Sequence, residues 1–419
     1  MSRATLRLRR RTSTRTLAVL TTLALPLGLL TATSGSAADA SHDPAAHDPA
    51  AGRRTAQIGH VSWGTNADFL AGRRGNATVV GDTVVIGKPK RRKVHGRVYR
   101  TGTWTSPWVT PGFDSTQILP SWEATTSGDA FVRVQIRARG TDGAQGSWDT
   151  IADWALDNPK VRRTTFSGQS DDLGKVSVDT WQATSTVTAW QVRVVMFKGR
   201  GKGHTVALER VGAVASAPRT LGATSQPGAA AGTVLPVPSY SQMTHRGHYP
   251  QFGGGGTAWC SPTSTAMVLA GYGLIPPVVG VPANHTDAVV DHTARRVYDH
   301  GYSGTGNWAF NTAYAATLVA GDAYVTRMAD LAEAETYIAQ GVPLVLSIAF
   351  SRGQLTGGPL TSSNGHLIVL VGFDAAGNPV VNDPAGASNG AVRRTYDRAE
   401  LEKIWLTASN GTAYVIRNS

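Results

Sequence analysis

Two segments in the first half of the chain alternate strictly between apolar and polar side chains. One side of AFVRVQIRARG, residues 130–140, carries Val132, Val134, Ile136 and Ala138, and AWQVRVVMFKG, residues 189–199, repeats the alternation. A period of two is typical of a β-strand with one face in the core. Because turn-forming clusters rich in Gly, Ser and Asp separate such segments, residues 58–215 are predicted to form an antiparallel β-sandwich, jelly-roll-like or similar.

Tryptophan is concentrated in this same region. Eight of the eleven tryptophans lie there: Trp63, Trp104, Trp108, Trp122, Trp148, Trp154, Trp181 and Trp190. One interpretation is a carbohydrate-binding face, because flat aromatic rings can cover the apolar faces of sugars. The alternative is that most of these rings fill the core or cover its edges. The pattern leaves both open and predicts an accessory domain in either case.

The pattern changes after a segment rich in Ala, Gly, Pro and Ser, residues 216–233, which is predicted to be a linker. Residues 234–419 then mix helical periodicity with strand-like runs, which indicates a second, α+β domain. Helices are expected at 260–270, 286–300, 304–321, 329–340 and 397–406. Strands are expected at 343–350, 366–373, 379–382, 392–396 and 413–417.

The only cysteine of the chain, Cys260, lies at the start of a predicted helix. Pro262 fits the first turn of a helix, and Gly271 and Gly273 are typical stop signals. The partial positive charge at a helix N-terminus favours the thiolate, which is the nucleophilic form of cysteine. The alternative is that Cys260 is a small buried core residue, as free cysteines often are.

A predicted hairpin favours the catalytic interpretation. His366 begins its first strand and Asp383 follows its second, so both are expected at one edge of the sheet. A thiol, an imidazole and a carboxylate from distant parts of a chain make the usual set for an activated nucleophile. Asn382 points to the opposite face of an ideal strand, and Asp374 is expected to be a turn residue.

Four motifs resemble the papain-like cysteine peptidases of family thirty-nine, the bacteriocin-processing type, and above all its stand-alone branch. They are VPSYSQM, WCSPTSTAMVL, GHLIVLVGFD and NPVVNDPAG, all within residues 234–419. The GNW segment at residues 306–308 also occurs in that branch. Ser261 departs from the family, which usually has glycine after the nucleophile.

The resemblance implies a papain-like fold in which Cys260, His366 and Asp383 form a catalytic triad. A glutamine side chain is the usual second donor to the oxyanion in such peptidases, and Gln242 occupies the family position. Its separation from the cysteine is wider here because of the glycine-rich stretch HRGHYPQFGGGG, which makes Gln251 a rival.

The first residues have the three-part organisation of a secretory signal peptide. A basic stretch precedes an apolar run interrupted by Pro26, and small residues follow up to Ala38. Residues 1–38 are therefore predicted to direct export, by the general or the twin-arginine route, with an uncleaved anchor as the alternative. Residues 39–57 are predicted to be disordered. A secreted or cell-wall-associated protein with no stable membrane span is expected.

Charge and motifs limit the partners. Without residues 1–38 the chain has 34 Lys and Arg against 28 Asp and Glu, a net charge of +6. This suits an anionic cell wall but does not indicate nucleic acid, because no aromatic-studded basic module surrounds the basic runs. His245 and His248 lack an obvious third ligand, so no metal is expected. The glycine-rich stretch has neither the Walker nor the Rossmann pattern, so no cofactor is expected.

Three functions fit these observations. The first is a secreted cysteine peptidase that acts through an acyl-enzyme on a peptide or protein substrate. The second is an amidase, acyltransferase or peptidoglycan hydrolase that uses the same triad. The third is a non-catalytic protein that binds the cell wall. An intact set of Cys, His and Asp favours the first two.

Overall fold

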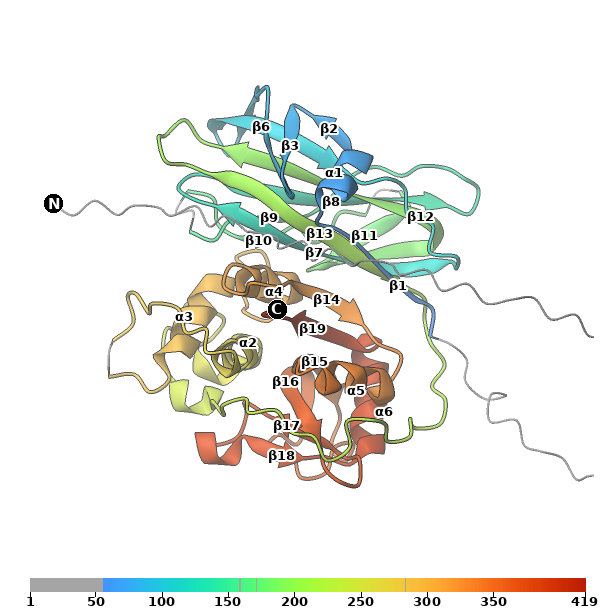
Figure 1. The fold of residues 1–419 in the computed structure, drawn as a ribbon, viewed down its shortest axis with the longest axis vertical. Helices are drawn as coiled ribbons and strands as arrows, with labels where there is room; N and C mark the ends of the chain where they lie inside the picture. Colours follow the sequence, from blue (N-terminus) through green and yellow to red (C-terminus); the bar gives the residue numbers. More distant parts are fainter. Residues whose placement is uncertain (1–55, 158–159, 171, 283) are drawn as a thin grey trace, which may run out of the picture. The chain divides into compact units, whose positions relative to one another are not determined.

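The computed structural model describes residues 56–157, 160–170, 172–282 and 284–419 (Figure 1). The predicted signal peptide, residues 1–38, and residues 39–55 of the predicted disordered segment lie outside the described residues. Within the described ranges, no helix has both the length and the apolar character needed to span a membrane.

The first domain is mostly β, as the alternating segments predict. It contains one short helix, α1 (Asn66–Ala71), and the following strands: β1 (Ile58–Trp63), β2 (Arg73–Gly75), β3 (Ala77–Val80), β4 (Thr83–Ile86), β5 (Lys90–Val94), β6 (Arg97–Thr105), β7 (Ser115–Thr126), β8 (Phe131–Gly140), β9 (Asp149–Trp154), β10 (Thr164–Thr165), β11 (Gly174–Ser177), β12 (Thr180–Lys198) and β13 (Val206–Ser216). The two alternating segments of the sequence are β8 and the C-terminal part of β12.

Hydrogen bonds join these strands into one sheet of 13 strands within the described residues, with the main order β10-β9-β8-β12-β7-β13-β4-β3. All pairs are antiparallel. The long strand β12 pairs with β8 and β6 along its C-terminal part and with β11 and β7 near its N-terminus. Because one strand takes both sets of partners, the hydrogen bonding does not divide into two separate sheets.

Six of the eight tryptophans in this domain are buried: Trp63, Trp104, Trp122, Trp154, Trp181 and Trp190. Trp108 and Trp148 are only partly buried. Arginine side chains lie over both rings, with Arg137 at 5.0 Å from the centre of the Trp108 ring and 4.5 Å from that of Trp148. Most of the tryptophans therefore fill the core, and only Trp108 and Trp148 are exposed enough to contact a ligand at the surface.

The second domain is built from helices α2 (Cys260–Gly271), α3 (Ala288–Val297), α4 (Trp308–Ala316), α5 (Leu331–Ala339) and α6 (Arg398–Ser409), from short 3-10 helices η1 (Gln242–His245), η2 (Gly256–Ala258) and η3 (Asn389–Ala391), and from strands β14 (Ala323–Arg327), β15 (Leu344–Phe350), β16 (Ser363–Phe373), β17 (Pro379–Asn382), β18 (Arg393–Thr395) and β19 (Thr412–Ile416). The strands form a six-stranded sheet in the order β14-β19-β15-β16-β17-β18.

Both faces of this sheet are covered, and the alternation along each strand shows how. Val345, Val369 and Tyr414 pack in one core cluster with residues of α2 and α4. Their neighbours Leu344, Leu370 and Val415 pack in another cluster with residues of α5 and α6. Because successive side chains of a strand point to opposite faces, each strand contributes to both clusters. Strands buried on both faces read as continuous apolar runs, as GHLIVLVGF does.

Most predicted elements of this domain are observed with small shifts at their ends, but the helix expected at 304–321 is confined to the nine residues of α4. Strand β17 has the predicted bounds, and Asn307 caps α4 by accepting a hydrogen bond from the backbone of Phe310 at 2.8 Å. Strand β14 (AYVTR) was missed, because it lies between the helices predicted at 304–321 and 329–340 and was assigned to no element.

The segment predicted to be a linker lies against the second domain. The carboxylate of Glu402 accepts a hydrogen bond from the backbone of Ser225 at 2.8 Å, and Glu335 accepts from Gly228 at 2.8 Å and from Ala230 at 3.1 Å. Arg398 donates to the backbone oxygen of Ser225 at 2.7 Å. Buried charged side chains far along the chain therefore hold a segment whose composition alone indicates flexibility.

Candidate active site

Cys260 is the first residue of α2, with Trp259 as the N-cap and Pro262 in the first turn. It is the free cysteine of the described chain and is partly exposed, so it is not sealed in the core. The hydroxyl of Ser264, one turn further along α2, donates to the backbone oxygen of Leu367 at 3.1 Å. This bond ties the helix to β16 next to His366, which brings the thiol to the strand that carries the imidazole.

His366 and Asp383 lie together, as the hairpin predicts. Nε2 of His366 is 2.7 Å from Oδ1 of Asp383, and both side chains are almost completely buried. His366 also shares a hydrogen bond with the Cys260 side chain. Because Asp383 occupies Nε2, Nδ1 is the ring nitrogen that is left for the thiol. The structure therefore brings the three predicted residues into one hydrogen-bonded chain.

The electrostatics of this chain favour a charged imidazole. Burial disfavours the imidazolium, but the charge and hydrogen bond of Asp383, followed by those of Cys260, outweigh it and raise the pKa of His366 to about 10. Burial also opposes the charged form of Asp383, yet the charge and hydrogen bond of His366 outweigh it and lower the pKa of that carboxyl. The imidazolium and the carboxylate thus stabilise each other.

Two further groups hold Asp383. The hydroxyl of Tyr396 donates to Oδ2 at 2.7 Å, and the backbone N–H of Ala385 donates to Oδ1 at 3.0 Å. Tyr396 is buried, and burial followed by the charge of Asp383 raises the pKa of its hydroxyl well above the ordinary value. Sequence reasoning missed Tyr396, which lies just beyond β18. The sequence signal that could have found it is its position directly after β18, because β18 pairs with β17 and β17 ends next to Asp383.

Gln242 is buried at the start of η1, and its backbone N–H donates to the oxygen of Pro384, the residue after Asp383, at 2.9 Å. Its side-chain amide donates to the backbone oxygen of Thr257 at 2.7 Å. The rival Gln251 is exposed on the intervening loop. Of the two glutamines, Gln242 is therefore the one fixed between the Asp383 loop and the segment that leads to Cys260.

The remaining residues singled out in the sequence have structural roles. The hydroxyl of Ser261 is buried at 2.8 Å from that of Tyr414, so a serine after the nucleophile is accommodated by a partner on β19. Asn382 turns away from His366 and donates to the backbone of Pro238 at 2.9 Å. Asp374 accepts from the backbone of Ala376 at 2.9 Å, as expected for a turn residue.

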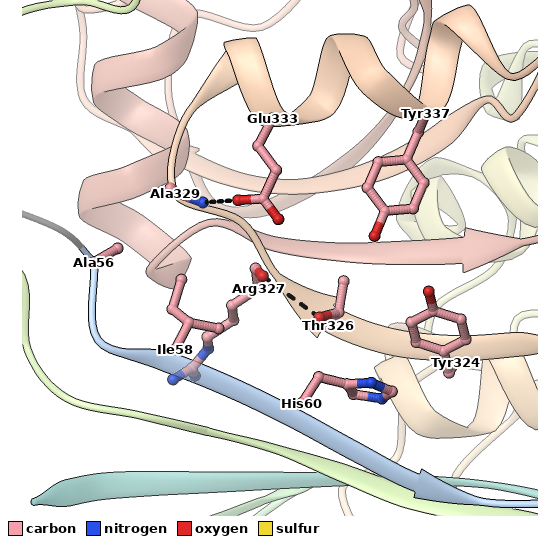
Figure 2. Close-up of a pocket in the computed structure, with 9 residues that line it drawn as sticks. All are labelled: Ala56, Ile58, His60, Tyr324, Thr326, Arg327, Ala329, Glu333 and Tyr337. Atoms are coloured by element: carbon pink, nitrogen blue, oxygen red, sulfur yellow. Dashed lines mark hydrogen bonds between the residues drawn. The ribbon is translucent and has the colours of Figure 1, made fainter. Parts of the chain in front are cut away.

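One hollow lies apart from these residues. A cavity of about 270 Å³ is lined by Ala56, by Ile58 and His60 of β1, and by Tyr324, Thr326, Arg327, Ala329, Glu333 and Tyr337 of the second domain (Figure 2). None of the three hydrogen-bonded residues Cys260, His366 and Asp383 lines it. Burial, the largest effect, lowers the pKa of His60 to about 4, which leaves a neutral ring stacked on Tyr324.

A group that could hold a metal lies in the second domain outside the hydrogen-bonded chain of Cys260, His366 and Asp383. Within the described residues, the ligand atoms of His245, His248 and Asp291 lie within 4.8 Å of one another. The sequence showed the two histidines but not the third member, because Asp291 lies 43 residues beyond His248.

Two family models match the chain, one on each side of residues 217–233, which join the two domains. Residues 59–216 match the Peptidase C39 N-terminal domain, and residues 234–413 match the Peptidase C39-like family. Residues 234–413 belong to the C39-like peptidase family. All the residues of the hydrogen-bonded chain lie within this C39-like domain, and the β domain before it is of the kind that accompanies such peptidases.

Solved structures give weaker resemblances, and no curated protein matches the chain. A Bacillus anthracis protein described as a candidate C39-like peptidase is 16% identical, with a TM-score of 0.27, and the match covers 45% of this chain and 98% of that one. A structure of infectious bursal disease virus, Gt strain, is 13% identical with a TM-score of 0.20, covering 42% of this chain and 37% of that one. Both TM-scores are low, so neither structure decides the function.

Proposed function

We propose that this chain is an exported cysteine peptidase that hydrolyses peptide bonds through Cys260, His366 and Asp383. The observation that carries the proposal is the hydrogen-bonded chain from the carboxylate through the imidazole to the thiol, inside a domain of the C39-like family. A nucleophile at a helix N-terminus, with its base and acid on the sheet beside it, also supports the papain-like α+β fold that the sequence predicts.

The reaction follows from these positions. His366 accepts the proton of Cys260 at Nδ1, and the thiolate attacks the carbonyl carbon of the peptide bond. Asp383 holds Nε2, which fixes the orientation of the ring and stabilises its positive charge. The imidazolium then donates its proton to the leaving amine, an acyl-enzyme forms, and a water molecule activated by His366 releases the second product.

The tetrahedral oxyanion needs donors that are already in place. The backbone N–H of Cys260 is one, and the side-chain amide of Gln242 is the second. The amide of Gln242 has two N–H groups, and Thr257 takes one of them, which orients the side chain and leaves the other for the oxyanion.

The test is the Cys260→Ala variant, assayed on a peptide library with a thiol-directed activity probe. Turnover and labelling are both expected to disappear, because no other thiol is present in the sequence. Thr265→Ser is a matched control on the same helix, because it keeps the hydroxyl that donates to Asn311 and removes only a methyl group. Hydrolysis retained by Cys260→Ala would remove the cysteine from the mechanism. Turnover of purified wall fragments in place of peptides would favour the amidase or peptidoglycan hydrolase alternative.

Contact with the cell wall is the second part of the proposal. Export by residues 1–38 would place a chain of net charge +6 beside an anionic wall. The partly exposed rings of Trp108 and Trp148, with arginines over them, offer stacking and positive charge together. Retention of the Cys260→Ala chain on insoluble wall glycan, compared with the same chain carrying Trp148→Ala, tests this contact, and equal retention would refute it.

A further inference from the structure

Three histidine side chains turn the same ring nitrogen toward one buried carboxylate in the C39-like domain. Nδ1 of His245 is 2.9 Å from Oδ2 of Asp291, and Nδ1 of His248 is 2.9 Å from Oδ1. Nδ1 of His285 is 3.4 Å from Oδ2. The rings of His248 and His285 are stacked, with centroids 3.9 Å apart. The nitrogens therefore surround the carboxylate from three separate positions in the chain.

The cluster joins two elements and is largely closed to solvent. His245 ends η1, His248 follows in the next turn, and Asp291 lies in the first turn of α3. The side chains of His245 and Asp291 are fully buried, and those of His248 and His285 are 23% and 20% exposed. The cluster therefore has a closed side at His245 and Asp291 and a side open to solvent at His248 and His285.

Hydrogen bonds alone do not account for this arrangement. A carboxylate only accepts, so each of the three imidazoles would have to present an N–H at Nδ1. Nδ1 of His285 faces Asp291 but is buried without a hydrogen-bond partner. Unpaired buried polar atoms are costly, and a group placed in this way calls for a ligand.

The distances suit a metal ion. With zinc–nitrogen and zinc–oxygen bonds of about 2.0–2.2 Å in a tetrahedral site, neighbouring ligand atoms lie about 3.3 Å apart. The contacts of 2.9 Å from His245 and His248 to Asp291 are a few tenths of an ångström shorter than that separation, and the ligand atoms of the three residues all lie within 4.8 Å of one another. Imidazole nitrogens with one carboxylate oxygen form a borderline ligand set, which suits zinc and similar transition metals better than calcium or magnesium.

We propose that His245, His248 and Asp291 bind one divalent transition-metal ion such as Zn²⁺, with the ring of His285 stacked on that of His248 beside them. The ion would be structural, since its three ligands are side chains of the C39-like domain and none of them belongs to the hydrogen-bonded chain of Cys260, His366 and Asp383. It would fasten η1 to α3 across the chain that separates them.

A consequence for catalysis rests on the proposed function. Gln242 begins the same η1 helix that His245 ends, so an ion at His245 would fix the helix that carries the oxyanion donor. Asn389 makes a second link between η1 and α3. Its side chain donates to Asp287, which precedes α3, at 2.6 Å, and it accepts from the backbone of Ser241, which precedes η1, at 2.8 Å. The metal would thus act on the site through position, without contact with substrate.

Metal binding can be measured without any turnover. The full chain carrying Cys260→Ala is stripped with a chelator, titrated with Co²⁺ or Zn²⁺, and analysed by Co²⁺ absorption, elemental analysis and thermal unfolding. The substitution removes the thiolate, the strongest zinc ligand outside the cluster. One equivalent of metal is expected to bind, and Zn²⁺ is expected to raise Tm, because an ion that binds only the folded chain stabilises it.

Asp291→Asn in this chain keeps the shape of the side chain and is expected to weaken metal affinity by at least about tenfold. His248→Gln is the second variant, since its partly exposed side chain can change without disturbing the core. His95→Gln is the matched control, because His95 also contacts a carboxylate, Asp153, at 3.0 Å but has no second imidazole there.

Binding of one equivalent that is lost in both cluster variants and kept in His95→Gln would support the site. The absence of stoichiometric binding, or equal affinity in His248→Gln and the parent chain, would overturn it and leave a hydrogen-bonded cluster. Since the assay contains no turnover step, a wrong assignment of the peptidase would not change its result.

Discussion

At the scale of single residues, Asp383 is the point where the site is held together. Its two oxygens accept from His366, Tyr396 and the backbone of Ala385, at 2.7, 2.7 and 3.0 Å. A buried carboxylate with this many donors keeps its charge, and that charge keeps His366 protonated and fixed in orientation. Tyr396 therefore acts on the imidazole through Asp383 and is a positioning residue.

Tyr396→Phe is expected to lower kcat by roughly tenfold, which corresponds to about 1.4 kcal/mol of transition-state stabilisation. The loss of its hydrogen bond also raises the pKa of Asp383, so the acid limb of the kcat/KM profile should move to higher pH. Tyr272→Phe is the control, because that hydroxyl donates to the backbone of Ile416 at 2.9 Å, outside the hydrogen-bonded chain. A pH profile like that of the parent chain would contradict a role through Asp383.

The raised pKa of His366 predicts how stability depends on pH. A histidine whose pKa rises from 6.5 to about 10 on folding contributes stability that is complete below pH 6.5 and is lost as the pH rises toward 10. In a Cys260→Ala background the raising effect of Cys260 is lost and that of Asp383 remains, so the free energy of unfolding should still fall from pH 6.5 upward, over a narrower range and by at most about 1.4 kcal/mol per pH unit. Asp383→Asn should remove most of this slope in urea unfolding. Parallel curves for the two chains would contradict the ion pair.

At the scale of elements, the glycine-rich loop explains how the side chain of Gln242 reaches the backbone of Thr257, just before Cys260, although the whole loop separates them in sequence. A Cβ on Gly256 would lie 2.1 Å from the backbone oxygen of His245, and one on Gly255 would lie 2.7 Å from that of His248. Glycine is needed at both positions because two stretches of backbone touch there. The loop folds back against η1 before it delivers the chain to α2.

Gly256→Ala is expected to lower the free energy of unfolding by roughly 1–3 kcal/mol, because the backbone must move to admit a methyl group. Peptidase activity should fall with it, since η1 and the start of α2 would separate. Gly390→Ala is the control, because the nearest atom to its added Cβ is the hydroxyl oxygen of Ser388 at 4.0 Å. Urea unfolding gives the free energy of unfolding of both variants. Equal values for Gly256→Ala and Gly390→Ala would mean that the loop admits a methyl group without cost.

At the scale of the whole molecule, one apolar cluster runs through both domains. The ring of Phe310 on α4 lies 6.1 Å from that of Trp122 and 5.2 Å from that of Trp154, both in the β domain. Polar contacts surround it: the hydroxyl of Thr165 donates to Asp299 at 2.7 Å, and the backbone of Trp308 donates to Asp179 at 2.8 Å. The two domains should therefore unfold together.

Phe310→Ala is expected to cost about 3–5 kcal/mol and to separate thermal unfolding into two transitions, because it removes the ring that both domains share. Phe373→Ala, in a cluster formed within the second domain alone, should cost a similar amount while keeping a single transition. Calorimetry of the three chains distinguishes these outcomes. Two transitions in the unmodified chain would show that the shared cluster does not couple the domains.

The sequence by itself determined most of the elements and the members of the hydrogen-bonded chain. Period-two alternation reports which strand faces are buried, and the helix signals around Cys260 and the hairpin around His366 and Asp383 are local in the chain. The tertiary structure alone decided the contacts between distant segments. These are the hydrogen bonds of Tyr396 with Asp383, of Glu402 with Ser225, and of Asp291 with His245. A local pattern fixes dihedral angles and faces, whereas a partner many residues away is chosen by packing and leaves no trace in spacing.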